Sequence, residues 1–350
     1  MSQVTQYAAV LAKIGAEKSK LLGEAKIRSL LESKDLATFA AQLRDTTYQT
    51  QIAKVLLPLT GRKLERAFTE NLIETYVKMI RNSPAKAAGF LSVYVLRFEV
   101  ENLKTLIKSI NGELNIEERL SRIYFSAEDF LKNRVILEEA AKSSNLKQMQ
   151  TSIKSSLYAS TLSRGMQGYE ENGSTSGFDI SLDKVFYDSL QDRYEKLPRT
   201  DKPHVNFYVA MENDGFTLLS ILRGKILNYD ANWLRAAMPP KNFKLTSETV
   251  EAMLTAPDFD TAMRVVSETF YGKFFAKAPS PEGTLGVAEK TLKKGIFKHA
   301  KAGTVGEIFN VGAPLAFMMV KEAEVRDLIA ATAGIEGGVS PNTILSQMSF

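Results

Sequence analysis

The side chains that most often carry out chemistry in enzymes are scarce in this chain. It has no cysteine and only two histidines, His204 and His299, so a zinc site built from such ligands is not expected. The segment Gly15–Ser19 lacks the second glycine of a phosphate-binding loop. The segment Gly173–Gly177 imitates the serine-hydrolase pattern G-x-S-x-G, but Thr175 occupies the nucleophile position. These patterns predict a protein without a catalytic site, metal or cofactor of its own.

Carboxylates are the remaining candidates for acid and base chemistry. Glu99 and Glu101 are two residues apart, and so are Glu322 and Glu324. On a helix, side chains at this spacing point to different sides, so neither pair suits a shared reaction. An enzyme that uses carboxylates alone, or that holds magnesium with them, would need acids from distant segments to converge. The sequence leaves that class of enzyme open.

A dense group of charges follows the apolar run Val311–Val320. It consists of Lys321, Glu322, Glu324 and Arg326. On a helix, Glu322 and Arg326 are neighbours one turn apart, and such a pair stabilises the helix by about 0.2–0.5 kcal/mol. The other interpretation is a polar surface that binds a partner.

The most informative pattern is a motif that occurs three times, at intervals of about 110 residues. In each copy an Asp or Asn opens a helix, apolar residues follow at helical spacing, and a Tyr stands thirteen residues after the opener. The openers are Asp35, Asn145 and Asp258, and the tyrosines are Tyr48, Tyr158 and Tyr271. Asp and Asn are preferred helix N-caps because their side chains accept hydrogen bonds from free backbone N–H groups.

Each copy has a second part, an acid with a Leu four residues later. The acids are Glu99, Asp214 and Glu324. A unit of this size is longer than a solenoid repeat of about 20–50 residues and is large enough to bury its own core. We therefore expect the tyrosines and acids to be packing and hydrogen-bonding positions in a repeated framework.

Helical periodicity extends over most of the chain and predicts an all-α protein. A helix is expected over residues 35–57 and a polar, glycine-rich loop over residues 168–177. Residues 204–210 are the one segment whose pattern could form a strand.

Turn-forming residues mark two boundaries between the copies. Asn111 with Gly112 ends the first copy, and Pro239 with Pro240 ends the second. Both pairs stop helices. We expect three helical repeat domains, over residues 1–111, 112–240 and 241–350.

Charge is unevenly distributed along the chain. The whole chain has 45 Lys and Arg against 40 Asp and Glu, but residues 1–110 alone have 17 basic and 10 acidic residues. Such a basic region could bind acidic protein, phospholipid headgroups or nucleic acid, or could be an ordinary solvated surface. The basic residues singled out as partner-binding candidates are Lys18, Lys20, Arg62 and Lys63.

The basic first third suggests an alternative function, a helical assembly scaffold or a nucleic-acid-binding protein. Aromatic residues interleaved with Lys and Arg would favour nucleic-acid binding, and the sequence has no such run. Residues 1–14 lack the pattern of a secretion signal, which predicts a cytosolic protein. The ten apolar residues of Val311–Val320 are about half of what a membrane helix needs. A membrane role would therefore depend on a partner or on the protein surface.

The segment Phe309–Ile344 resembles the C-terminal signature of the C subunit of the archaeal and V-type rotary ATPases, the relative of the d subunit of vacuolar ATPases. In that family an apolar segment leads into K-E-x-E-x-x-N-L and then a glycine-rich turn. The matching positions are Lys321, Glu322, Glu324 and Leu328, while Asp327 replaces the usual Asn.

Other segments extend the resemblance over essentially the whole chain. Ala12–Leu22 is similar to the family's A-R-x-R-x-x-K-S-x-L-L, although neither Arg is retained. Glu99–Lys108 and Asp214–Lys225 look like the family's internal acid, Asn-Leu and Arg motifs. In the second of these, Thr217 departs from Asn and Arg223 is kept.

The resemblance implies three similar helical domains arranged as a funnel with approximate three-fold symmetry. It implies a non-enzymatic central-stalk rotor subunit that contacts the membrane-embedded proteolipid ring at one end and receives the central shaft at the other. This function belongs to ATP-linked proton or sodium transport, peripherally on the cytoplasmic side of the cell membrane. It involves neither nucleic acid nor a small-molecule substrate.

Two hypotheses assign residues to these contacts. The basic residues of the first third dock on the ring or on nearby headgroups. Arg223 and the group from Lys321 to Arg326 line or brace the funnel for the shaft.

Overall fold

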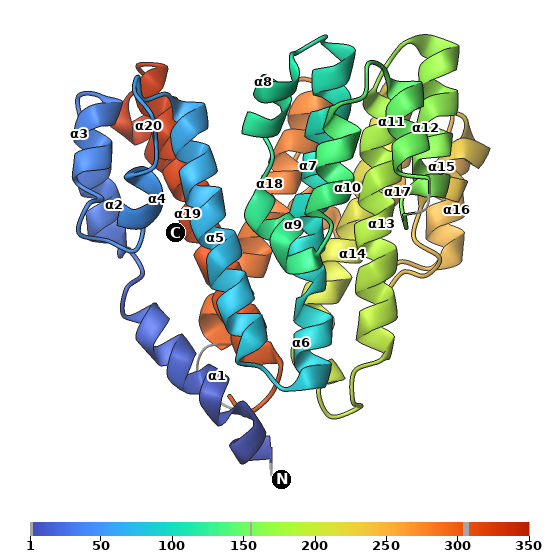
Figure 1. The fold of residues 1–350 in the computed structure, drawn as a ribbon. Coiled ribbons are helices and arrows are strands. Elements are labelled where there is room, and N and C mark those ends of the chain that lie inside the picture. Colours follow the sequence, from blue (N-terminus) through green and yellow to red (C-terminus); the bar gives the residue numbers. More distant parts are fainter. Residues whose placement is uncertain (1–2, 155, 304–307, 350) are drawn as a thin grey trace. The chain divides into compact units, whose positions relative to one another are not determined.

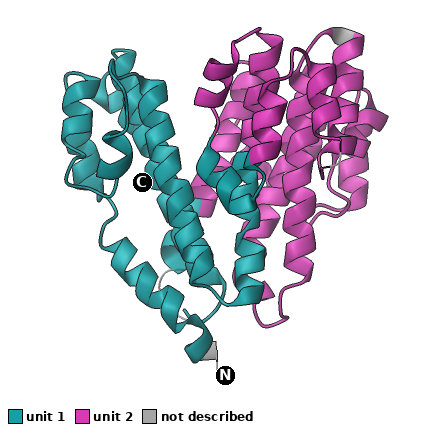
Figure 2. Ribbon diagram, viewed as in Figure 1, with its two compact units in different colours: residues 1–99, 124–134, 297–350 teal, residues 100–123, 135–296 magenta. Residues whose placement is uncertain are grey.

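The computed structural model describes residues 3–154, 156–303 and 308–349. Every regular element in these ranges is a helix (Figure 1), which confirms the all-α prediction. The chain divides into two compact units, which are described separately (Figure 2).

Unit 1 combines Met1–Glu99, Tyr124–Arg134 and Phe297–Phe350. Its helices are α1 (Gln3–Lys18), α2 (Glu24–Leu31), α3 (Leu36–Ala41), α4 (Gln49–Ile52), α5 (Gly61–Arg81), α6 (Ala85–Leu91), α9 (Phe125–Leu131), α19 (Gly312–Glu336) and α20 (Pro341–Leu345). It also contains the first residues of α7 (Val93–Asn111) and the last of α18 (Pro281–Gly303).

The core of unit 1 forms where α5 and α19 lie side by side (Figure 1). One stripe of α5 is buried at every fourth residue, namely Leu64, Phe68, Leu72 and Tyr76. The first eight residues of α19, 312–319, are all buried, as expected for a helix that is apolar on every side. Because α5 belongs to the first copy of the repeat and α19 to the third, this unit joins the beginning of the chain to its end.

Unit 2 combines Val100–Ile123 and Val135–Ile296. Besides its parts of α7 and α18, its helices are α8 (Ile116–Ser121), α10 (Arg134–Ala141, from Val135), α11 (Leu146–Ser152), α12 (Ala159–Asn172), α13 (Ser176–Glu195), α14 (Lys202–Ile226), α15 (Ala231–Ala237), α16 (Ser247–Thr255), α17 (Phe259–Ser267) and the 3-10 helix η1 (Gly272–Phe274). Its central helix is α14, which packs against α13, α16 and α17.

The three predicted openers cap their helices with one shared geometry. Asp35, Asn145 and Asp258 are the N-caps of α3, α11 and α17, with φ between −157° and −148° and ψ between 169° and 174°. Each side chain accepts a hydrogen bond from the N–H three residues later. The donors are Thr38 at 2.7 Å, Gln148 at 2.9 Å and Thr261 at 2.7 Å.

The three tyrosines also occupy equivalent turns. Tyr48, Tyr158 and Tyr271 each precede the next helix, with φ between −90° and −84°. In each copy, the residue two positions before the tyrosine has a hydroxyl group. This hydroxyl accepts a hydrogen bond from the tyrosine N–H and donates one to the carbonyl of the residue five positions before the tyrosine. These hydroxyls belong to Thr46, Ser156 and Thr269. The local geometry of the motif is therefore the same in all three copies.

Several elements differ from the sequence-based expectations. Residues 204–210 lie inside α14, so the candidate strand is helical. The helix expected over residues 35–57 is interrupted between α3 and α4 and ends at Ile52. Most of the loop expected over residues 168–177 is helical, because α12 extends to Asn172 and α13 begins at Ser176.

The division into three repeat domains stays a prediction. The two compact units follow other boundaries, since the first and last parts of the chain share unit 1.

Candidate functional site

A buried polar cluster in unit 1 joins the first and third copies of the repeat. The Tyr48 hydroxyl donates to Glu324 Oε1 at 2.6 Å, and Lys321 Nζ donates to both the Tyr48 hydroxyl and Glu324 Oε1 at 2.8 Å. The second carboxylate oxygen of Glu324 accepts from the backbone N–H of Leu22. Helix α19 thus positions two charged groups, one turn apart, against the turn that carries Tyr48.

The ammonium group of Lys321 is held inside unit 1. Lys321 is only 3 % exposed, and its Nζ atom lies 4.1 Å from the centre of the Tyr48 ring. Burial lowers the pKa of Lys321 below its usual range, although the Glu324 carboxylate acts in the opposite direction. Burial, followed by the charge of Glu324, raises the pKa of Tyr48.

A lysine, a tyrosine and a carboxylate in contact could transfer protons if a substrate reached them. Tyr48 is fully buried and Glu324 is 6 % exposed, so no substrate has access to these atoms. The polar atoms satisfy one another instead, which is what a buried charge requires. Through Leu22, the cluster also fixes the segment that follows α1.

Unit 2 has a comparable cluster around Asp214 on α14. The Tyr271 hydroxyl donates to Asp214 Oδ2 at 2.8 Å. The backbone N–H groups of Phe243, Lys244 and Leu245 donate to the same carboxylate at 2.8, 2.7 and 3.2 Å. Burial, followed by the charge of Asp214, raises the pKa of Tyr271.

In both clusters the tyrosine of one copy bonds to the acid of another. Tyr48 of the first copy meets Glu324 of the third, and Tyr271 of the third copy meets Asp214 of the second. Each acid also accepts a hydrogen bond from a backbone N–H group in the segment before the helices that lead to the tyrosine. The donor is Leu22 for Glu324 and Phe243 for Asp214. Each acid therefore connects two different copies of the motif.

The remaining tyrosine and acid are buried in different units. Tyr158 belongs to unit 2 and Glu99 to unit 1. Within unit 1, Asn133 Nδ2 donates to Glu99 Oε1 at 2.6 Å.

The other charges of α19 have separate partners. Glu322 Oε2 accepts from the Tyr76 hydroxyl at 2.8 Å, and Glu322 Oε1 lies 3.5 Å from Arg97 Nη1. Arg326 donates to the Ser349 hydroxyl at 3.0 Å. Lys321 and Glu324 thus belong to the interior of unit 1, whereas Glu322 and Arg326 are partly exposed.

The four basic candidates of the first third do not form one patch. Lys20 and Lys78 both pair with the buried Glu17, at 3.3 and 3.1 Å, which places Lys20 near the C-terminal end of α5. Arg62 lies in the first turn of α5, sixteen residues before Lys78. At the α-helical rise of about 1.5 Å per residue, these two positions are about 24 Å apart. Lys18 and Lys20 are therefore close to the C-terminal end of α5, whereas Arg62 and Lys63 are at its N-terminal end.

Arg223, the candidate in unit 2, is half-buried on α14. Burial would raise the pKa of Glu289, but nearby positive charges lower it below its usual value. Lys293 contributes most to this lowering, and Arg223 contributes less.

Comparison with known proteins places the chain in a family. Residues 10–347 match the family described as ATP synthase (C/AC39) subunit. The chain belongs to this family.

Three relatives of the family are each named as the C subunit of an A-type ATP synthase. The protein from Methanocaldococcus jannaschii is 25 % identical over 347 residues, which cover 97 % of this chain and 85 % of the relative. The protein from Thermococcus kodakarensis is 24 % identical, with coverage of 97 % and 89 %. The protein from Methanothermobacter thermautotrophicus is 25 % identical, with coverage of 96 % and 86 %.

Membership in the ATP synthase (C/AC39) subunit family makes the chain a non-catalytic component of a rotary ATPase. Within the described ranges, no group of three or more His, Asp or Glu side chains could hold a metal ion. None of the helices that the structure describes is both long and apolar enough to cross a bilayer.

Sequence reasoning missed two features of this family member. The contacts of Glu17 with Lys20 and Lys78 fasten α1 to α5, but a pair separated by 61 positions has no local signal. The connection after α4 exposes Leu56 and Leu57, where the sequence pattern predicts a helix.

Proposed function

We propose that this chain is the central-stalk rotor subunit that couples the shaft of a rotary ATPase to its proteolipid ring. In this role it serves ATP-linked transport of protons or sodium ions, and it lies peripherally on the cytoplasmic side of the cell membrane. Its relatives named as C subunits of A-type ATP synthases support this proposal.

The observation that carries the proposal is the shared geometry of the three motif copies. Three N-caps and three tyrosine turns have closely similar backbone angles and the same hydrogen bonds. A socket with approximate three-fold symmetry needs one framework used three times. We assign its three walls to residues 1–111, 112–240 and 241–350.

The buried clusters suit transmission of torque. Close-packed interiors resist compression and transmit strain. Hydrogen bonds that the tyrosine hydroxyls donate to the carboxylates of Glu324 and Asp214 add directional constraints between segments that lie far apart in the sequence. Lys321 and Glu324 act in the proposal by holding α19, and not as direct contacts.

The proposed contact residues are those with accessible side chains. Lys18 and Lys20 form one basic pair, and Arg62 and Lys63 form another. Both pairs are proposed to face the ring or nearby headgroups. Arg223, Glu322 and Arg326 are the proposed contacts of the shaft.

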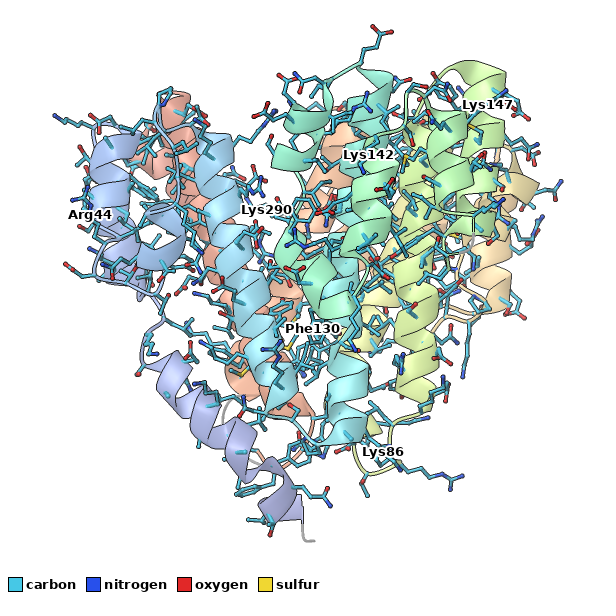
Figure 3. The ribbon with its side chains drawn as sticks, in the orientation of Figure 1. Arg44, Lys86, Phe130, Lys142, Lys147 and Lys290 are labelled. Carbon is cyan, nitrogen blue, oxygen red and sulfur yellow. The ribbon has the colours of Figure 1, made fainter. Side chains whose placement is uncertain are left out.

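The experiment is affinity purification of the full chain from detergent-solubilised membranes, with the co-purified proteins identified. We expect ring and shaft subunits. Charge reversal of Lys18 with Lys20, or of Arg62 with Lys63, should weaken capture of the ring, and rising salt should weaken capture by the unaltered chain. Reversal of Lys142 and Lys147, two exposed lysines labelled in Figure 3, is the matched control and should have no effect.

Several results would contradict the proposal. Capture of nucleic acid alone, without ring or shaft subunits, would favour the scaffold or nucleic-acid-binding alternative. Ring capture that no charge reversal changes would exclude the basic pairs as contacts. Alanine at Arg223, Glu322 and Arg326 that leaves assembly and coupled ATP hydrolysis intact would exclude these residues as shaft contacts.

A further inference from the structure

The most exposed large apolar side chains in the described residues are two consecutive leucines. Leu56 is 79 % exposed and Leu57 is 82 % exposed. They lie on the connection between α4 and α5, in unit 1. Single exposed apolar residues are ordinary on protein surfaces, whereas exposed apolar side chains that adjoin further apolar surface form a candidate interaction surface.

The leucines are presented by a braced segment. Lys63 Nζ donates to the carbonyl oxygens of Leu56 and Pro58, at 3.0 and 2.9 Å. These bonds connect the segment to the first turn of α5 and satisfy two of its backbone carbonyls. Backbone carbonyls that are already hydrogen-bonded cost less to bring toward an apolar environment.

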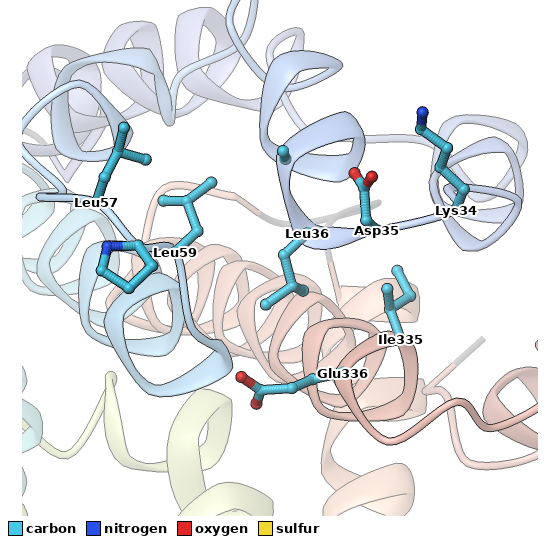
Figure 4. Close-up of a pocket in the computed structure, with 9 residues that line it drawn as sticks. Lys34, Asp35, Leu36, Leu57, Leu59, Ile335 and Glu336 are labelled. Carbon is cyan, nitrogen blue, oxygen red and sulfur yellow. The ribbon is translucent and has the colours of Figure 1, made fainter.

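Leu57 also lines an open hollow on unit 1 (Figure 4). Its volume is about 840 Å³, and its apolar lining consists of Leu36, Ala37, Leu57, Pro58, Leu59 and Ile335. Leu57 thus stands at the edge of a larger apolar area, to which α3, the connection before α5 and the end of α19 all contribute.

The charged groups around this area favour a negatively charged partner. Lys34 lines the hollow, Lys54 precedes the exposed leucines by two residues, and Arg62 and Lys63 lie in the first turn of α5. The side chains of Lys34, Lys54 and Arg62 are exposed. The two carboxylates that line the hollow already serve helix N-termini. Asp35 accepts from the N–H of Thr38, and Glu336 accepts from the N–H of Gly61 at 3.0 Å.

We propose that Leu56 and Leu57 insert into the headgroup and upper acyl region of an anionic lipid bilayer, with Lys54 and Arg62 contacting lipid phosphates. We name this surface the leucine tip, comprising residues 54–63. Apolar insertion and basic attraction are the two signals whose combination gives stable peripheral attachment. A bilayer accepts protruding aliphatic side chains without a shaped pocket, which fits two leucines that project outward.

The proposal shares with the rotor function only the contact of Arg62 with headgroups. Insertion of the two leucines goes beyond that function, and it is tested on the isolated chain with lipid. The experiment is co-sedimentation of the purified full chain with vesicles of phosphatidylglycerol and phosphatidylcholine, and with vesicles of phosphatidylcholine alone. We expect binding to the anionic vesicles that weakens as salt rises. Leu56→Ser with Leu57→Ser should lower the partition coefficient by at least about tenfold.

The matched control is Val135→Ser with Ile136→Ser. These residues are also consecutive and exposed, at 70 % and 40 %, but lie on α10. This variant should bind the vesicles like the unaltered chain. A Leu57→Trp variant adds a direct readout, because its emission should shift to shorter wavelength on anionic vesicles, measured against the single natural tryptophan, Trp233.

Three results would overturn the proposal. They are absence of binding to anionic vesicles, equal losses in the leucine and control variants, and an emission spectrum of the Leu57→Trp variant that vesicles do not change. A fourth result would also overturn it: if the leucine variant keeps vesicle binding but loses one of the proteins in the detergent-purified complex, the leucine tip is a protein contact. Failure of vesicle binding leaves the co-purification test of the rotor function unaffected, so the two failures are distinguishable.

Discussion

Tyr48 donates a hydrogen bond of 2.6 Å to Glu324, which follows it in the chain by 276 positions. The bond connects the first copy of the motif to the third, inside a unit that contains both ends of the chain. Its counterpart in unit 2 runs from Tyr271 to Asp214. A hydrogen bond from the tyrosine of one copy to a buried acid of another copy therefore occurs in both units.

Removing the Tyr48 hydroxyl should weaken the connection between the first and third copies. We expect Tyr48→Phe to lower the free energy of unfolding by about 1.5–3 kcal/mol, since a hydrogen bond to a charged group is lost and a buried carboxylate loses a donor. Urea denaturation measures the change. The control is Tyr169→Phe, which removes a 2.7 Å bond to Asn111 at an exposed position and should have a much smaller effect. Equal effects would contradict a special contribution from the buried hydrogen bond.

Lys321 and Glu324 should be strongly coupled. Lys321→Met leaves the Glu324 carboxylate buried without its cation and should cost about 3–5 kcal/mol. Adding Glu324→Gln removes the unpaired charge, so the double variant should be more stable than the sum of the single effects implies. A double-mutant cycle of unfolding free energies tests this. Additive effects would show that the two groups do not interact.

The attachment of α1 should depend on pH through Glu17. Burial alone would raise the pKa of Glu17, but hydrogen bonds and charge from Lys78 and Lys20 outweigh it, so the folded pKa lies below its usual value of 4.5. A carboxyl with a lowered folded pKa stabilises the protein above the unfolded pKa, and this contribution is lost as pH falls through the folded pKa.

Unfolding free energies of the unaltered chain and of Glu17→Gln, measured across the acid range, test this dependence. The stability advantage of the unaltered chain should be constant above about pH 5 and should shrink below pH 4.5. Lys78→Gln should reduce the same advantage, because it removes the cation that contributes most to lowering this pKa. A difference that does not change with pH would contradict this role of Glu17.

Two glycines should respond oppositely to alanine. A Cβ at Gly272 would lie 2.5 Å from the carbonyl oxygen of Ser267, which is backbone and cannot easily move. Gly272→Ala should therefore cost about 1–3 kcal/mol. Gly168 lies inside α12, and apart from its chain neighbours and the nearby backbone of its own helix no atom lies within 4 Å of such a Cβ. Gly168→Ala should therefore stabilise the protein by about 0.5–1 kcal/mol. Thermal unfolding compares the two, and destabilisation by both would contradict the prediction.

The repeated helix starts could be predicted from local sequence. Asp35, Asn145 and Asp258 cap helices because a short polar side chain can reach an N–H three residues away, whatever the rest of the chain does. Local patterns are less reliable where packing decides. Residues 204–210 alternate like a strand, yet they belong to the 25-residue helix α14, most of whose residues are buried.

The sequence by itself therefore determined the all-α class, the three motif copies and the family signature, because these depend on side chains close to one another along the chain. Only the tertiary structure decided that Lys321 and Glu324 are buried against Tyr48, that the basic candidates of the first third divide into two distant pairs, and that Leu56 and Leu57 remain exposed. The physical reason is that burial and pairing depend on which distant segments pack together. The sequence alone does not show whether the ammonium group of a lysine is in water or, like that of Lys321, packed against a tyrosine ring.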